Sequence, residues 1–225
     1  MLLLGFFFAE LSLLFILSQK LTSLLFIFLH RLTRSTKIAT YCLSLLFFPG
    51  TLLHEFSHAL MARFLFVPIY HMEFVPKLSG ETIKMGSVSI AKSDIIRRLL
   101  IGVAPFFIGT AALLGILYLA VLNHLFENRL FIIIIGYLIF TIGNTLFSSK
   151  KDLEGAIEFL VIIAILAGLS YLLGFRFPAL NLETIFANSL IKQLLQKGVF
   201  FLMVPVGIDL LCVIMLSILR QYEKK

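Results

Sequence analysis

Apolar residues dominate this chain in long runs that are separated by short polar or basic stretches. A helix that crosses the hydrocarbon core of a bilayer needs about 20 mostly apolar residues. Six runs are long enough, and we expect a membrane-spanning helix in each: residues 2–29, 38–67, 99–122, 130–147, 156–173 and 198–219. The pattern therefore predicts an all-α polytopic membrane protein.

The segment between the second and third runs, residues 68–94, has a different pattern. Apolar and polar residues alternate over residues 69–75 and again over residues 83–90, on either side of a Ser-Gly pair. This alternation predicts a small β-hairpin. Such a hairpin either presents a strand edge to an extended polypeptide or lies at the membrane interface without a direct role.

Composition extends this picture to the whole chain. Of the 225 residues, 60% are hydrophobic, against roughly 45–50% in a soluble domain. We expect a single transmembrane domain over residues 1–225, with the hairpin as an insertion. The net charge of +7 comes from Lys and Arg that flank the apolar runs, which is typical of contacts with the lipid bilayer rather than with nucleic acid. Their bias among the loops predicts that both termini lie in the cytoplasm.

Two histidines and a glutamate interrupt the second run, in the order His54-Glu55-Phe56-Ser57-His58. Polar groups at such a depth are costly and usually functional. His54 and His58 are four residues apart, so on a helix they share one face and can bind the same zinc ion at about 2.0–2.1 Å. Glu55 lies on an adjacent face, where it can take a proton from a water molecule that attacks a peptide carbonyl.

Pro49 and Gly50 come just before this motif. Proline removes one helical hydrogen bond, so we expect a kink there. The kink either helps water and an extended peptide to approach the motif or is an ordinary transmembrane proline.

A catalytic zinc ion usually has three protein ligands and one open position. His54 and His58 supply two. The residue types alone leave several candidates for the third ligand: Asp152, Glu154, Asp94, Glu73, His71, His124, Glu158 and Asp209.

Residues 48–59, Phe-Pro-Gly-Thr-Leu-Leu-His-Glu-Phe-Ser-His-Ala, resemble the active-site helix of the site-2 protease family of intramembrane zinc metalloproteases. That family also has a distal motif in which an Asn is followed eight residues later by an Asp, and Asn144 and Asp152 have this spacing. The resemblance implies one zinc ion per chain with Asp152 as its third ligand. It also implies that Asn144 helps to position the substrate or the oxyanion.

Two further features bear on the resemblance. Residues 102–105, Gly-Val-Ala-Pro, are similar to a Gly-Pro element that the family has at the start of the third span. The prolines usual between Asn and Asp are absent, and Gly155 follows Asp152 by three residues instead of one. Glu154 therefore stays open as a rival third ligand.

The leading hypothesis is a zinc-dependent endopeptidase of a prokaryotic cell membrane, with its catalytic core over about residues 38–174. Its partners are a membrane-anchored protein or peptide substrate and the bilayer; a regulatory membrane partner is not identified. An alternative is a transporter or metal-handling protein with His54, Glu55 and His58 on an ion pathway. A third is a non-catalytic scaffold. Residues 175–225 have no assigned role.

Overall fold

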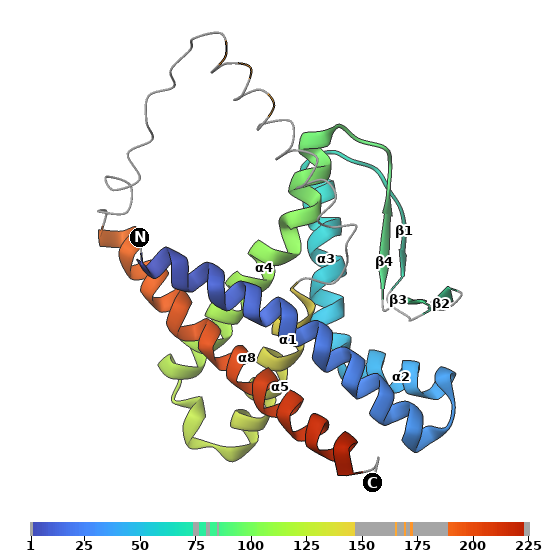
Figure 1. The fold of residues 1–225 in the computed structure, drawn as a ribbon. Coiled ribbons are helices and arrows are strands. Elements are labelled where there is room, and N and C mark those ends of the chain that lie inside the picture. Colours follow the sequence, from blue (N-terminus) through green and yellow to red (C-terminus); the bar gives the residue numbers. More distant parts are fainter. Residues whose placement is uncertain are drawn as a thin grey trace.

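The structure is a computed structural model that describes residues 2–73, 77–79, 82–84, 86–146 and 189–222, together with Ile165, Leu169 and Leu172. The described part is mostly helical, as the sequence predicts (Figure 1). Its elements are α1 (Leu2–Thr33), α2 (Thr36–Leu46), α3 (Phe48–Phe64), β1 (Ile69–Glu73), β2 (Lys77–Ser79), β3 (Thr82–Lys84), β4 (Ser87–Ile90), α4 (Ile95–Leu122), η1 (Leu125–Glu127), α5 (Arg129–Thr145) and α8 (Ser189–Tyr222).

Three described helices, α1, α4 and α8, are long and apolar enough to cross a membrane. They correspond to the first, third and sixth predicted spans. The second predicted span is the bent pair of α2 and α3, which makes a fourth crossing if the pair is one broken span. The fourth corresponds to α5, a shorter apolar helix of 17 residues. The fifth lies almost wholly outside the described residues, so the described part of the chain does not confirm a count of six.

Helices α1 and α8 lie side by side and run in the same direction (Figure 1). Near their starts, Gly198 packs against the ring of Phe7. Further along, Leu17, Leu21 and Leu24 of α1 form one cluster with Val213 and Leu216 of α8. The leucines recur every three or four residues, so they form one stripe along α1.

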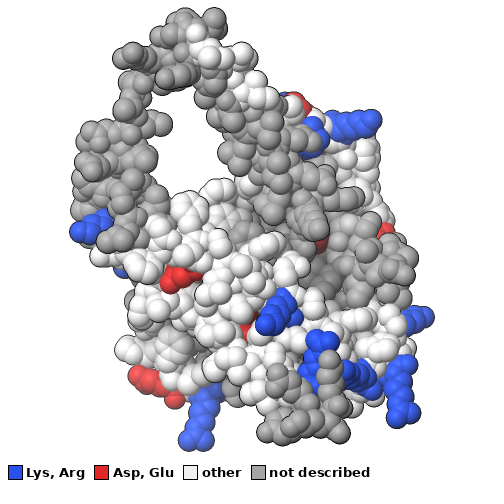
Figure 2. Space-filling view, in the orientation of Figure 1, with Lys and Arg blue, Asp and Glu red and all other residues white. Residues whose placement is uncertain are grey.

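This parallel packing does not support the expected placement of both termini in the cytoplasm. Parallel neighbouring helices that both cross a bilayer begin on the same side, so if α1 and α8 both cross, the start of α1 and the end of α8 are on opposite sides. Arg220 of α8 is then on the same side as the basic residues around the junction of α1 and α2, which are Arg31, Arg34 and Lys37. Figure 2 shows Lys and Arg side chains gathered at that end of the molecule.

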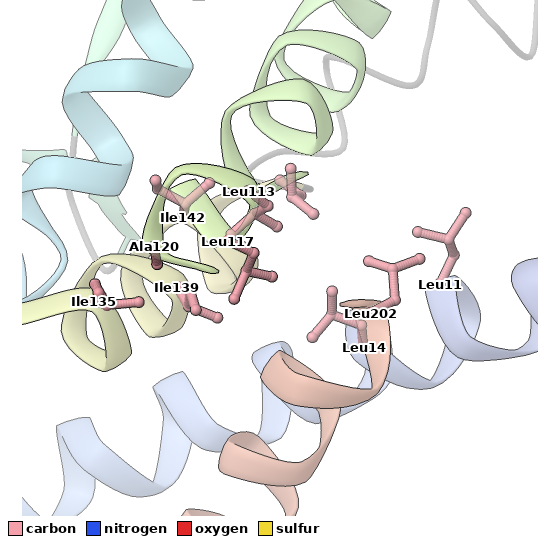
Figure 3. Close-up of a cluster of buried hydrophobic side chains, with 10 residues drawn as sticks. Leu11, Leu14, Leu113, Leu117, Ala120, Ile135, Ile139, Ile142 and Leu202 are labelled. Atoms are coloured by element: carbon pink, nitrogen blue, oxygen red, sulfur yellow. The ribbon is translucent and has the colours of Figure 1, made fainter. Parts of the chain in front are cut away.

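The main apolar core joins α1, α4, α5 and α8 (Figure 3). Helices α1, α4 and α5 contribute residues three or four apart and α8 contributes one leucine, so four sequence-distant segments share one cluster of aliphatic side chains. The cluster consists of Leu11, Leu14, Leu113, Leu117, Ala120, Ile135, Ile139, Ile142, Leu146 and Leu202. It holds α5 in the middle of the bundle, beside the helix that carries the polar motif.

The predicted kink is present as a bend of 72° between α2 and α3. Pro49 lies in the first turn of α3, where a missing N–H costs nothing. Phe47, at the bend, is buried and stacks on Phe140 of α5, with ring centroids 5.5 Å apart. The hydroxyl of Tyr137 donates to the carbonyl of Leu46 at 2.9 Å. These two contacts with α5 therefore hold the bend between α2 and α3 in place.

The strand-like segment forms two small antiparallel pairs, β1 with β4 and β2 with β3. Its base is held by the N–H of Ala91, which donates to the carbonyl of Pro68 at 2.9 Å. Ile69 and Ile90 pack on the cluster of Ala62, Val67 and Ile101. The predicted β-hairpin insertion is thus confirmed, and it rests on α3 and the start of α4.

Helix α4 begins directly after this insertion. The carboxylate of Asp94 accepts a hydrogen bond from the backbone N–H of Arg97 at 2.9 Å and caps the helix. This bond, aided by the nearby Arg97 charge, lowers the pKa of Asp94 below the usual aspartate value.

Candidate metal centre

The polar motif lies in the middle of α3 and faces the inside of the bundle. His54, Glu55 and His58 are 4%, 6% and 8% exposed. The other buried residues of α3 are small: Gly50, Thr51, Ser57, Ala59 and Ala62. They let neighbouring backbones come close to the motif, which matters because both histidines bond to backbone atoms.

His54 is oriented by the end of α5. Its Nδ1 lies 2.7 Å from the carbonyl oxygen of Thr145. Thr145 is the last residue of α5, where carbonyls lack an intrahelical partner. One turn earlier on both helices, Gly50 lies against the backbone of Thr141, and a Cβ at Gly50 would overlap its carbonyl. A glycine at position 50 is thus what allows α3 to approach α5.

His58 is oriented by α4. Its Nδ1 lies 2.8 Å from the carbonyl oxygen of Ile101. A carbonyl oxygen only accepts hydrogen bonds, so Nδ1 carries the hydrogen in both histidines. In a neutral imidazole, Nε2 is then the acceptor.

The two Nε2 atoms lie 3.1 Å apart. Two neutral imidazoles have two N–H groups in total, and both are used on the carbonyls of Thr145 and Ile101. With the hydrogens on Nδ1, a proton or a metal cation between the two Nε2 atoms would stabilise their close approach.

A zinc ion fits this gap. Two nitrogens that are each about 2.0–2.1 Å from a tetrahedral zinc ion lie about 3.3 Å from each other. The observed 3.1 Å is close to that value. An N–H bonded to a backbone carbonyl is also the usual outer contact of a metal-binding histidine. The histidines present thus fit a zinc ion by spacing, tautomer and outer contacts.

Glu55 lies under the β-hairpin. A Cβ added at Gly86, just before β4, would be 2.8 Å from Cγ of Glu55 and 3.1 Å from its Oε1. The backbone at Gly86 therefore packs directly on the glutamate side chain. This contact brings the predicted insertion and the predicted general base together.

Four candidates for the third ligand are placed in other contacts. His71 and Glu73 bond to each other at 2.8 Å on the hairpin. Asp94 caps α4, and His124 lies 3.4 Å from Glu127 at an exposed turn.

Within the described ranges, no third His, Cys, Asp or Glu joins the two histidines in a group that could hold a metal. The remaining candidates Asp152, Glu154 and Glu158 lie outside those ranges.

Asn144 and the eighth candidate, Asp209, form a separate buried pair. The Nδ2 of Asn144 donates to Oδ1 of Asp209 at 2.7 Å and to the carbonyl of Phe140 at 2.9 Å. Both amide hydrogens are therefore used. In this arrangement Asn144 offers an acceptor, Oδ1, rather than a donor to an oxyanion.

Sequence reasoning missed several of these contributors. The carbonyls of Thr145 and Ile101 leave no side-chain signal, because every residue type has a carbonyl. Gly50 could have been identified from the sequence, because a glycine one helical turn before His54 marks a place where another helix can come close. The role of Gly86, and the pairing of Asp209 with Asn144, become visible only through the packing of the hairpin on α3 and of α8 on α5.

Comparison of the chain with protein-family models, with curated proteins and with solved structures finds no match. Its function is therefore argued from the chemistry of the site.

Proposed function

We propose that this chain is an intramembrane zinc endopeptidase that hydrolyses peptide bonds in or near transmembrane segments of membrane-anchored proteins. The observation that carries the proposal is the His54–His58 pair, whose three contacts need one cation beyond the two imidazole hydrogens. One zinc ion per chain would be held by these two imidazoles and by Asp152.

A bound zinc ion supplies an activated water and polarises the peptide carbonyl. The residue that moves protons in this proposal is Glu55, beside His54 in the chain and buried with it. Its carboxylate accepts a proton from water as the water oxygen bonds to the carbonyl carbon. The C–N bond then breaks, and Glu55 passes the proton to the leaving nitrogen.

The proposal of Asp152 as the third ligand rests on chain connectivity and on the Asn144-to-Asp152 spacing. The chain leaves α5 at Thr145, whose carbonyl bonds to His54, and Asp152 follows seven residues later. Glu154 is the alternative ligand. Asp152→Ala compared with Glu154→Ala, scored by zinc content, separates the two.

Substrate access needs an unwound polypeptide, because the carbonyls of a transmembrane helix are bonded within the helix. The proposed platform for the unwound segment is the β1–β4 pair. Gly86, just before β4, packs on Glu55, so a peptide that pairs with the edge of this sheet would run close to the general base.

The same observation favours a second candidate. A proton between the two Nε2 atoms also satisfies the pair, and His54, Glu55 and His58 would then be part of a proton or metal-ion pathway. This candidate predicts ion transport without peptide hydrolysis.

The deciding experiment uses the full chain in detergent or reconstituted vesicles. We expect about one zinc ion per chain by mass spectrometry and cleavage of a model transmembrane substrate. Glu55→Gln should keep the zinc and abolish cleavage. Glu127→Gln is a matched control, because Glu127 is an exposed carboxylate beside His124. Wild-type protein that takes up no zinc, or a Glu55→Gln variant that still cleaves, would rule the protease out.

A further inference from the structure

Pro105 lies inside α4, four residues after Ile101, and is buried. In a regular α-helix the carbonyl of residue 101 accepts a hydrogen bond from the N–H of residue 105. Proline has no N–H, so this carbonyl lacks its helical donor. It is the same carbonyl that lies 2.8 Å from Nδ1 of His58.

We infer that Pro105 is a positioning residue for His58: its missing N–H leaves the Ile101 carbonyl to the imidazole, which holds the ring with Nε2 turned toward His54. This inference rests on the proposed metal site and extends it to a residue that touches neither metal nor substrate. Each histidine therefore donates to a backbone carbonyl that has no donor within its own helix, but the reason differs between the two. For His54 the carbonyl is free because α5 ends at Thr145; for His58 it is free because a proline interrupts the ladder of α4.

The consequence is chemical as well as geometric. With Nδ1–H bonded to a carbonyl, the tautomer that leaves Nε2 as a metal ligand is favoured. Such outer contacts raise ligand basicity, and their loss typically costs 10–100-fold in metal affinity. A restored N–H at position 105 would compete with His58 for one oxygen. Because a carbonyl oxygen has two lone pairs, the bond to His58 would be weakened rather than abolished.

The test compares two replacements of Pro105 in the full-length protein. Pro105→Ala restores the N–H, whereas lactic acid, the hydroxy analogue of alanine, removes the proline ring without restoring it. We expect zinc affinity, measured by competition with a chromophoric chelator, to fall about 10-fold in Pro105→Ala. The lactic acid variant should stay within about twofold of wild type. Pro205→Ala, the same change inside α8, should also stay within about twofold.

A second readout needs no metal. Nitrogen NMR of labelled histidine reports which ring nitrogen carries the hydrogen. In metal-free Pro105→Ala, His58 should shift toward the Nε2–H tautomer, while His54 should not change because its partner is on α5. Unaltered affinity with an unaltered His58 tautomer would overturn the inference, as would an equal loss in the lactic acid variant. If wild type binds no zinc, the protease proposal fails, and the tautomer comparison still decides the role of Pro105.

Discussion

The His54–His58 pair and the Asn144–Asp209 pair both place hydrogen-bonding side chains among apolar helices. In the first, the hydrogens point outward to the carbonyls of α4 and α5, and the lone pairs of the Nε2 atoms converge at 3.1 Å. In the second, a hydrogen already lies between the partners, from Nδ2 of Asn144 to Oδ1 of Asp209. Oδ1 of Asn144 and Oδ2 of Asp209 have no hydrogen-bond partner among the described residues.

The two pairs differ in where their hydrogen-bond donors point and in which acceptors remain. In the histidine pair two lone pairs meet at 3.1 Å, so under the proposed function a cation would lie between them. The Asn144–Asp209 pair has two acceptor oxygens without a partner among the described residues, so added hydrogen-bond donors rather than a cation would complete it. Both pairs are buried, so the property that separates them is the direction of their hydrogens. Three experiments, from the largest expected effect to the smallest, test the two pairs and the glutamate beside the first pair.

The largest effect is expected from removing a ligand. His54→Ala and His58→Ala should each reduce zinc from about one per chain to background, because the zinc ion would lose one of its three proposed protein ligands. Asp209→Asn should retain about one zinc ion. Metal content of the purified proteins checks this. A histidine variant that keeps its zinc would show that the two pairs do not differ as described.

A smaller effect is expected at the contact between the hairpin and the general base. In Gly86→Ala the new methyl group would lie 2.8 Å from Cγ of Glu55, so the carboxylate must move. A displacement of about 1 Å from productive geometry can cost about 100-fold in rate. We expect cleavage to slow by about that factor while zinc content stays at the wild-type level.

The matched control is Gly115→Ala in α4, where nothing lies within 4 Å of an added Cβ. It should cleave at the wild-type rate. If Gly86→Ala also cleaves normally, the hairpin does not fix the position of Glu55.

The smallest effect is expected at the second pair. In Asp209→Asn, Oδ1 can still accept from Asn144, the unpaired Oδ2 is replaced by an N–H donor, and only Oδ1 of Asn144 is left as an unpaired acceptor. We expect the variant to be more stable by about 1 kcal/mol, which raises the melting temperature by about 2–4 °C. Thermal unfolding in detergent measures this. A lower melting temperature would mean that the Asp209 carboxyl group is better satisfied than the described contacts indicate.

The amino-acid sequence determined the local features of this protein. Run lengths predicted the helices that became α1, α4 and α8, and alternation predicted the strands between α3 and α4. The four-residue spacing put His54 and His58 on one face of α3, and Pro49 marked the bend. These features follow from helix and strand periodicity and from the missing N–H of proline, which act over a few residues.

The tertiary structure decided everything that depends on contact between distant segments. The parallel packing of α1 on α8 sets the position of the termini, and no periodicity within either helix encodes it. The carbonyls that orient His54 and His58 come from positions 91 and 43 residues away in the chain. A backbone carbonyl is the same in every residue type, so only the packing of α4 and α5 on α3 could identify which two are free to accept. That packing orients both imidazoles so that their Nε2 atoms lie 3.1 Å apart.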